Sequence, residues 1–329
     1  MNPNGNPYPA LSVPAREIPV PSSVSEQAQA ILALGPLSPP VEYPPLDDAA
    51  SWRGMIAAQA QAIREMTGGS GSTAGVRVEE TSVDGACVYV ITPDGIGPED
   101  RRVYLEIHGG AFIHEGGEVC RQRGIDNARR IGARSWAVDY RMPPDHPYPT
   151  PLDDCVAAYR ALLEQHRPEE IIIGGPSAGA NLAASTILRA RVEGLPLPAA
   201  AVLHSPVSDL TGSGDTRRTN LGLDNILTGQ SMAPILLYAA GHDLRDPYLS
   251  PVFADFRPGF PPTLLLSGTR DLLLSDTVRL HRALRAAGVP AELHVWEAAA
   301  HGGFLGRAPE DDERNTEIRR FIGRHWPAG

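Results

Sequence analysis

A serine flanked by glycines is the clearest candidate for chemistry in this sequence. Residues 171–182 read Ile-Ile-Ile-Gly-Gly-Pro-Ser-Ala-Gly-Ala-Asn-Leu, so a β-branched run leads into a Gly-x-Ser-x-Gly turn and then into a segment with helical character. In this strand-to-helix context the turn is typical of a nucleophile elbow, in which the serine lies on a sharply reversing backbone. A Cβ at Gly175 or Gly179 would crowd that turn. We therefore predict that Ser177 is a nucleophile.

A nucleophilic serine needs hydrogen-bond donors for the negative charge that develops on an attacked carbonyl. The apolar run Val-Tyr-Leu-Glu-Ile leads directly into His108-Gly109-Gly110, and consecutive glycines let the main chain approach a ligand closely. We predict an oxyanion hole formed by the amides of Gly109, Gly110 and Ala178, the last being next to the nucleophile. Taken alone, the His-Gly-Gly sequence would also fit a glycine turn without a function.

The acid that orients a catalytic base is expected after a strand, because open α/β sheets bind ligands at the carboxyl ends of their strands. The buried run Leu-Leu-Leu-Ser-Gly-Thr-Arg-Asp ends at Asp271, which we predict to be this acid. The nearby Asp276 is interpreted as the N-cap of the helix that follows. Asp153 and Asp154 precede the elbow and are interpreted as structural.

The chain has ten histidines, and His301 is the one predicted to be the base. His281 falls within a predicted helix, His294 within a predicted strand, and His325 in the C-terminal tail. His301 follows the last predicted strand, and two glycines after it can turn the chain. We expect His301 to take the Ser177 proton, and Asp271 to hold the imidazole tautomer and stabilise its charged form.

The elements that must position these residues alternate between short apolar strands and longer helical segments from residue 76 onward. This alternation predicts an α/β class with a mostly parallel sheet covered on both faces by helices. Strands are predicted at 76–82, 86–92, 102–107, 135–139, 170–174, 199–204, 263–267 and 291–296. Helices are predicted at 25–34, 47–66, 118–131, 151–165, 178–192, 276–287 and 311–324.

The sequence divides into four parts. Residues 1–75 are predicted to be an N-terminal extension with two helices, of which the first opens with a serine cap, and a flexible linker at Gly68–Gly75. Residues 76–206 and 256–329 are predicted to form the catalytic core. Residues 207–255 contain no predicted strand and are interpreted as a cap insertion, which with the N-terminal helices would roof the site.

Composition limits the class of protein. With 329 residues, 42% hydrophobic and 21% charged, the chain can bury a large core without metals or disulfides. A net charge of −10 without a basic stripe argues against nucleic acid as a partner. The three cysteines are scattered, and are interpreted as incidental thiols in a reducing compartment. The N-terminus lacks a signal-peptide pattern and no segment is apolar enough to span a membrane, so a cytoplasmic location is expected.

The residues also resemble those of a known family. His108-Gly-Gly-Ala-Phe, the Gly175-Pro-Ser-Ala-Gly elbow, and Val138-Asp-Tyr-Arg-Met-Pro-Pro-Asp-His-Pro-Tyr-Pro are similar to the hormone-sensitive-lipase-like (bacterial family IV) esterases of the α/β-hydrolase superfamily. Leu152-Asp-Asp, Ser205-Pro-Val-Ser-Asp-Leu, and Asp271 with Leu273 continue the match. The resemblance covers about residues 76–325. It implies an eight-stranded α/β-hydrolase fold with a two-part cap, serine carboxylesterase activity and no cofactor.

The sequence departs from that family at several positions. Ala111 stands where the family usually has a third glycine, Pro176 where it has Asp or Thr, and Ala180 where it has Gly. Ala111 adds a methyl group beside the oxyanion loop, and Pro176 removes an amide just before the nucleophile. The stretch 114–118, His-Glu-Gly-Gly-Glu, is also unusual; it either lines the entrance to the site or is a solvated loop.

Several functions fit these residues. The leading hypothesis is hydrolysis of short- to medium-chain carboxylic esters, since there is little sign of an interfacial surface. Cleavage of lactones, amides or carbamates, or removal of acetyl groups from natural products, would use the same triad. A ligand-binding receptor on a catalytically dead hydrolase fold is a further alternative. A homodimer that pairs through an edge strand near 291–296 is suggested only by the resemblance. Phe112, Trp52, Tyr238 and Phe304 are candidates for pocket walls or for core.

Overall fold

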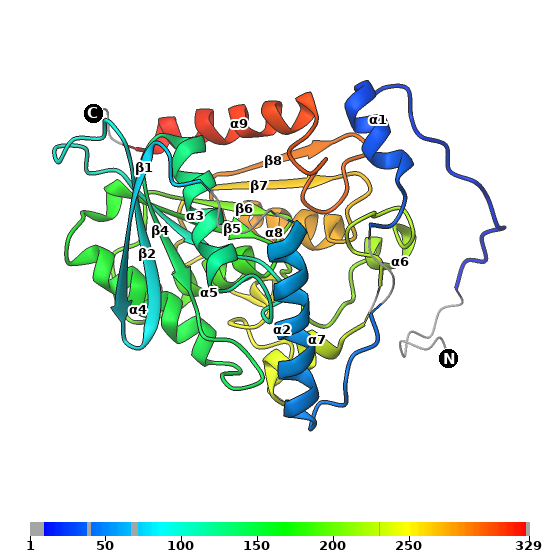
Figure 1. Ribbon diagram of the computed structural model, residues 1–329, viewed down its shortest axis with the longest axis horizontal. Coiled ribbons are helices and arrows are strands. Elements are labelled where there is room, and N and C mark those ends of the chain that lie inside the picture. Colours follow the sequence, from blue (N-terminus) through cyan, green and yellow to red (C-terminus); the bar gives the residue numbers. More distant parts are fainter. Residues whose placement is uncertain (1–9, 38–40, 67–71, 230, 327–329) are drawn as a thin grey trace.

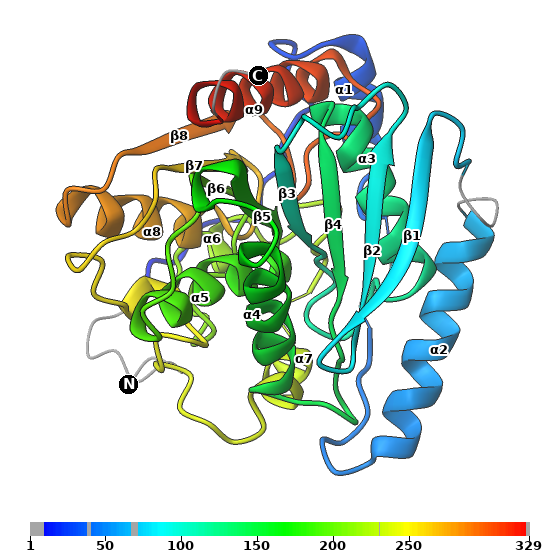
Figure 2. The same cartoon turned by 90° about the vertical axis from the view of Figure 1, so that its left-hand side faces the viewer.

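The chain folds around one eight-stranded sheet (Figures 1 and 2). The computed structural model describes residues 10–37, 41–66, 72–229 and 231–326. The strand order is β1-β2-β4-β3-β5-β6-β7-β8. β1 pairs with β2, and β2 with β4, in antiparallel fashion, while every other pairing is parallel. The strands are β1 Val76–Val83, β2 Ala86–Pro93, β3 Val103–Ile107, β4 Arg134–Asp139, β5 Ile171–Pro176, β6 Ala200–His204, β7 Thr263–Gly268 and β8 Ala291–Trp296.

Helices cover both faces of the sheet, because alternate residues of each strand point to opposite sides. On one face, Tyr104, Ile172 and Leu264 pack against α9 (Pro309–His325). On the other face, the neighbouring Leu105, Ile173 and Leu265 join the main core. α3 (Glu118–Ile131) lies on the α9 side, against β2 and β4. α4 (Thr150–Leu163), α5 (Ala178–Val192) and α8 (Leu274–Ala286) belong to the main core, on the opposite side (Figure 2).

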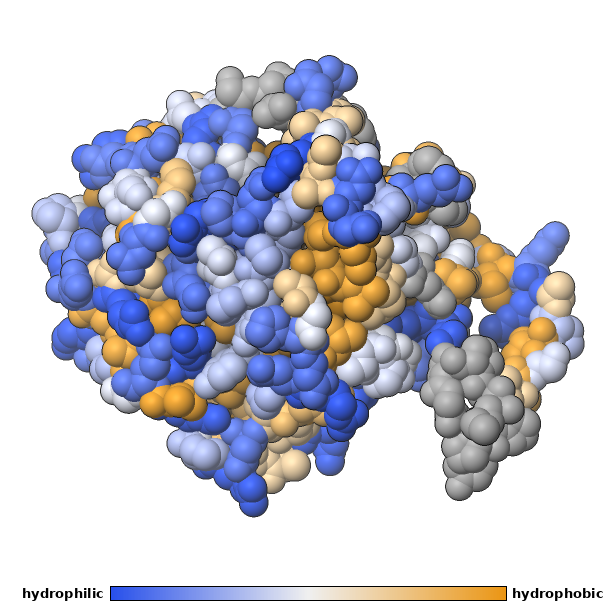
Figure 3. All heavy atoms as spheres, turned by 90° about the horizontal axis from the view of Figure 1, so that it is seen from below, coloured by the Kyte–Doolittle hydropathy of each residue, from blue (hydrophilic) through white to orange (hydrophobic). Residues whose placement is uncertain are grey.

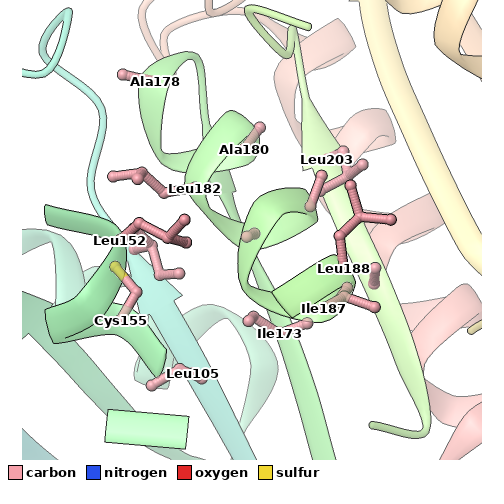
Figure 4. Close-up of a cluster of buried hydrophobic side chains, with 14 of the residues drawn as sticks. Leu105, Leu152, Cys155, Ile173, Ala178, Ala180, Leu182, Ile187, Leu188 and Leu203 are labelled. Atoms are coloured by element: carbon pink, nitrogen blue, oxygen red, sulfur yellow. The ribbon is translucent and has the colours of Figure 1, made fainter. Parts of the chain in front are cut away.

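α5 is the helix that begins at the elbow, and nearly all of its residues are buried. Figure 4 shows Leu188 of α5 beside Leu203 of β6, and Leu182 beside Leu152 and Cys155 of α4. A helix buried on most of its circumference is held in place by its neighbours rather than by its own amphipathic stripe. The position of its first residue, and of the serine before it, is thus fixed by the whole core.

The N-terminal helices pack at two separate places. α1 (Glu26–Ala33) lies against α9 and the loop that follows β8, and the Ser25 hydroxyl accepts a hydrogen bond from the Ala28 N–H as predicted for a cap. α2 (Ala49–Met66) buries Trp52 against Ile113 and Leu237. Of the predicted extension and linker, residues 1–9, 38–40 and 67–71 lie outside the described residues. Residues 10–21 have no regular secondary structure.

Residues 207–255 connect β6 to the stretch before β7 and contain no strand in their described part. They carry α6 (Thr216–Thr219), α7 (Ala233–Ala239) and the 3₁₀ helix η2 (Pro251–Phe253). Another 3₁₀ helix, η1 (Pro168–Glu170), precedes β5. Leu237 of α7 meets Trp52 of α2 and Ile113 of the loop after β3 in one buried cluster. The two segments predicted to form a cap therefore contact each other beside the His-Gly-Gly loop. Whether they act as a cap remains a prediction.

On the face seen from below, most residues are hydrophilic, and the largest group of apolar residues lies right of centre (Figure 3). None of the helices in the described ranges is long and apolar enough to cross a membrane.

Candidate active site

Ser177 lies on the sharp turn between β5 and α5, with φ 55° and ψ −117°. A non-glycine residue in this region of φ is strained, and such strain persists only where the surroundings impose it. The Ser177 N–H donates to the His204 carbonyl at 2.8 Å, which attaches the turn to β6. The predicted nucleophile elbow is therefore present in the backbone.

The glycines of the elbow are required by close packing. A Cβ on Gly175 would lie 2.0 Å from the Ile107 carbonyl oxygen, and a Cβ on Gly179 would lie 2.0 Å from the same atom. Both residues therefore face the end of β3, where the oxyanion loop begins. Pro176 occupies the last position of β5. Ala180 is buried in α5, and no hydrogen bond in the described part of the chain joins it to Ser177, Asp271 or His301.

His301 and Asp271 lie together as predicted. His301 Nδ1 is 3.2 Å from Asp271 Oδ1, and the Asp271 side chain is fully buried. Asp271 also accepts hydrogen bonds from the Ser267 hydroxyl and the Leu273 N–H, both at 2.8 Å. Ser177, Asp271 and His301 follow β5, β7 and β8, whose parallel pairing through β6 places their carboxyl ends at one edge of the sheet.

The electrostatics of this pair suit a base and its orienting acid. Burial alone would raise the pKa of Asp271, but the His301 imidazole and the hydrogen bonds that the carboxylate accepts hold it at about 2. Burial alone would lower the pKa of His301, but Asp271, with help from Asp224 and Glu115, raises it above 6.5. Asp271 therefore stays ionised, and it stabilises the imidazolium that forms when His301 accepts a proton.

The loop of the predicted oxyanion hole lies directly beside the elbow. A Cβ on Gly109 would be 3.1 Å from the Pro176 carbonyl oxygen and 3.5 Å from Ser177 Cβ. Within the described chain, the N–H groups of Gly109, Gly110 and Ala178 make no hydrogen bond, and that of Ala111 makes none either. These groups are therefore available to a ligand. Their assignment as the oxyanion hole remains a prediction.

Tyr140 orients this loop, and the sequence analysis gave it no separate role. Its hydroxyl donates to the carbonyls of His108 and Gly109 at 3.1 and 3.0 Å, and its ring stacks on the buried His108 ring at a centroid distance of 4.0 Å. In a trans peptide the C=O and the following N–H point in opposite directions. Tyr140 therefore turns the N–H groups of Gly109 and Gly110 away from itself. The only sequence signal for Tyr140 was its place in the stretch 138–149 that resembles the family.

The stretch 114–118, which continues the loop after Ala111, is partly exposed, and its interpretation as an entrance lining or a solvated loop stays a prediction. His114 and Glu115 are half-buried, and Glu115 Oε1 pairs with Arg123 at 2.6 Å. Glu115 Oε2 lies 3.4 Å from the position of a Cβ on Gly109. Burial opposes ionisation of this carboxyl, but Arg123 and two histidines hold its pKa below the usual value. A negative charge thus lies beneath the oxyanion loop.

The aromatic candidates for pocket walls are all buried. Phe112 stacks on Tyr238 with a centroid distance of 4.0 Å, which joins the oxyanion loop to α7. Trp52 belongs to the α2 cluster, and Phe304 to the cluster beneath α1. The core interpretation therefore holds for all four of these residues.

Of the aspartates that were set aside, Asp154 has a structural role, and the prediction for Asp276 needs a correction. Asp154 is buried and pairs with Arg141 at 2.6 Å. Asp276 is not an N-cap, because α8 begins two residues earlier at Leu274, and Leu273 is the N-cap. The buried Asp276 carboxylate instead pairs with Arg217 of α6 at 3.0 Å. The sequence could not show this partner, which lies 59 residues away.

One group of side chains has the residue types of a metal site. His108, Cys120 and Asp139 each offer a ligand atom, and these atoms all lie within 4.8 Å of one another. The Asp139 carboxylate accepts a hydrogen bond from the Gly117 N–H, and the His108 Nδ1 is 3.1 Å from the Gly109 carbonyl. Both residues thus already have roles in the loops beside the site.

The chain is similar to known proteins over most of its length. Residues 104–305 match a family model described as alpha/beta hydrolase fold. An acetyl-hydrolase of Streptomyces hygroscopicus is 36% identical over 205 residues, which are 62% of this chain and 68% of that protein. The crystal structure of esterase E25 superposes with a TM-score of 0.83 at 35% identity, covering 97% of this chain and 99% of that one. The structure of a hormone-sensitive lipase from a metagenome library superposes with a TM-score of 0.79 at 30% identity, covering 91% and 98%.

Proposed function

Because the chain belongs to the hormone-sensitive-lipase-like esterases of the α/β-hydrolase superfamily, and is a carboxylic ester hydrolase, we propose that it cleaves short- to medium-chain esters through an acyl-enzyme on Ser177. The observation that carries this proposal is the strained Ser177 turn at the same sheet edge as the His301–Asp271 pair. No cofactor takes part in the proposed reaction.

In the proposed acylation, His301 accepts the Ser177 proton while the hydroxyl oxygen attacks the ester carbonyl. The amides of Gly109, Gly110 and Ala178 stabilise the oxyanion, and His301 then gives its proton to the leaving alcohol. In deacylation, His301 takes a proton from water as the water oxygen attacks the acyl-enzyme, and it then gives that proton to Ser177 Oγ as the acid is released. Asp271 remains ionised throughout.

A second candidate is removal of acetyl groups from a larger alcohol. The acetyl-hydrolase of Streptomyces hygroscopicus favours this reading, since that protein shares 36% identity with the chain. Lactones, amides and carbamates fit the same triad. The predicted cytoplasmic location and the homodimer through β8, which forms an edge of the sheet, remain predictions.

The test is hydrolysis of p-nitrophenyl esters from acetate to palmitate by the wild type and by Ser177→Ala. We expect activity to peak at short or medium acyl chains and to disappear in the variant, together with a burst of p-nitrophenol in the wild type. Activity that survives in Ser177→Ala would overturn the assignment of the nucleophile. A wild type that cleaves only long-chain esters would overturn the proposed substrate class.

A further inference from the structure

Asp224 contacts both of the loops that carry the acid and the base. It lies in the segment 207–255 and is fully buried. Its Oδ2 accepts hydrogen bonds from the Leu272 N–H at 3.0 Å and from the His301 N–H at 3.3 Å. Its Oδ1 accepts from the N–H groups of Ile226 and Leu227 at 2.9 and 3.0 Å. One carboxylate therefore joins the residue after Asp271 to the main chain of His301.

Asn220 adds a second attachment to the acid loop. Its Nδ2 donates to the carbonyls of Thr269 and Asp271 at 3.0 and 2.9 Å. Asn220 and Asp224 are four residues apart, and the Asp224 N–H donates to the Asn220 carbonyl at 3.3 Å. The turn 220–224 therefore hydrogen-bonds to the main chain on both sides of the acid. Asn220 donates to the Asp271 carbonyl, and Asp224 accepts from the Leu272 N–H.

We propose that Asn220 and Asp224 form a clamp that positions Asp271 and His301 for catalysis. Two residues of segment 207–255, outside the sheet, would then hold the acid and the base in place. This inference rests on the proposed function, in which Asp271 is the acid and His301 is the base. It brings together loops that follow different strands, β7 and β8, and no other segment of the described chain hydrogen-bonds to both Leu272 N–H and His301 N–H. Asn220 and Asp224 are positioning residues, since they act through hydrogen bonds to the main chain of the loops that carry Asp271 and His301.

The clamp also brings a second carboxylate to the base. Asp224 accepts hydrogen bonds only from N–H groups, and such an environment favours the ionised form. The groups that face His301 are Asp271, Asp224 and Glu115, which raise its pKa, and His204 of β6, whose own pKa burial lowers. Burial raises the pKa of Asp224, and the nearby His301 opposes that shift. Loss of the Asp224 charge should therefore make His301 easier to deprotonate.

Three variants separate positioning from charge. Asn220→Ala removes two hydrogen bonds to the acid loop and leaves every charge near His301 in place. Asp224→Asn removes the charge and turns N–H donors toward the N–H groups that the carboxylate served. Asp215→Asn is the matched control, because Asp215 is exposed in the same segment and its side chain makes no hydrogen bond in the described structure.

The measurements are kcat and KM for p-nitrophenyl butyrate against pH, and the rate at which diisopropyl fluorophosphate phosphorylates Ser177 with loss of fluoride, which needs no ester substrate. We expect Asn220→Ala and Asp224→Asn to lower kcat by roughly 10- to 100-fold with little change in KM, as small misplacements of catalytic groups do. The acid limb of the pH–rate profile, where activity falls as the pH decreases, should move to lower pH in Asp224→Asn only. Asp215→Asn should behave as the wild type.

Unchanged kcat and unchanged rates of Ser177 phosphorylation in a folded Asp224→Asn or Asn220→Ala would overturn the clamp. A lower melting temperature with an unmoved pH profile in Asp224→Asn would show a merely structural role and would also overturn it. If Asp224→Asn fails to fold, Asn220→Ala decides by its kcat. A wild type without ester hydrolysis that still reacts with the fluorophosphate would contradict the proposed substrate, and the Ser177 phosphorylation rates of the variants would then decide on the clamp.

Discussion

The proposed chemistry depends on the interaction between the charges of Asp271 and His301, which burial protects from screening by solvent. Asp271 is fully buried and His301 is largely covered, so their interaction is screened little by solvent. The same burial would favour neutral forms of both groups if either stood alone. Their pairing at 3.2 Å reverses this preference, and the pKa of the acid falls to about 2 while that of the base rises.

The pH dependence of activity follows from the raised pKa of His301. The imidazole must be neutral to accept the Ser177 proton, and below its pKa it is protonated and inactive. We expect kcat/KM for p-nitrophenyl butyrate to fall as the pH decreases through a value above 6.5. In Asp271→Asn this limb should move to lower pH and the maximum rate should drop. An acid limb below 6.5 in the wild type would contradict the arrangement.

The residues of the proposed triad stand out in the sequence because each has a local signature. Gly175 and Gly179 mark the elbow, and Asp271 and His301 each follow a run of strand-forming residues. Asp224 and Tyr140 have no such signature, since their roles exist only through contacts with distant segments. The partner of Glu115 was not predictable, because the sequence does not show that Arg123 of α3 is turned toward it.

At the scale of elements, the oxyanion loop is shaped by the strand next to its own. β3 and β4 are parallel neighbours, and Tyr140 follows the last residue of β4. Its hydroxyl therefore reaches the carbonyls at the end of β3. The loop thus has the conformation that this neighbour imposes, and Ala111 and Phe112 lie at positive φ of 53° and 67° within it.

Tyr140→Phe tests this dependence. The variant keeps the ring stacked on His108 and removes the two hydrogen bonds of the hydroxyl. We expect kcat to fall roughly 10- to 100-fold with little change in KM, since oxyanion donors act mainly in the transition state. Tyr159→Phe is the matched control, because the Tyr159 hydroxyl donates to the Pro196 carbonyl outside the site. Equal kcat values for the two variants would contradict a role of Tyr140 in orienting the loop.

The extents of the elements were predictable, and the strand order was not. The predicted strands agree with the observed ones to within two residues at each end, because buried strands and amphipathic helices have distinct periodicities. The order β2-β4-β3-β5 requires crossovers that no local pattern encodes. The irregular path of residues 207–255 was predictable only as the lack of a strand. Its short helices depend on packing against α5, α8 and the acid loop.

At the scale of the whole molecule, the insertion 207–255 is fastened to the sheet domain at both of its ends. The buried Asn181 of α5 donates from Nδ2 to the carbonyls of Val207 and Leu249, at 2.6 and 2.8 Å. Near the second end, Ser185 of α5 donates to the Tyr248 carbonyl at 2.8 Å. The helix that begins at the nucleophile thus also anchors the segment that carries Asn220 and Asp224.

Asn181→Ala measures the strength of this attachment. The variant leaves two buried carbonyls without their donor, which we expect to cost about 1–3 kcal/mol of unfolding free energy. Gln165→Ala serves as the control, because the Gln165 side chain is exposed, and its loss should change stability by less than about 0.5 kcal/mol. Urea denaturation followed by circular dichroism gives both values. A stability of Asn181→Ala equal to that of the control would show that the insertion is held by other contacts.

The stack of Phe112 on Tyr238 joins residues 207–255 to the loop proposed to bind the oxyanion. An engineer who exchanges residues 207–255 with those of a relative, in order to alter substrate range, would also exchange the ring against which the oxyanion loop rests. Such a chimaera would change turnover even for a substrate too small to touch the new segment. Keeping Tyr238, Asn220 and Asp224 in the graft is therefore the design rule that this architecture sets.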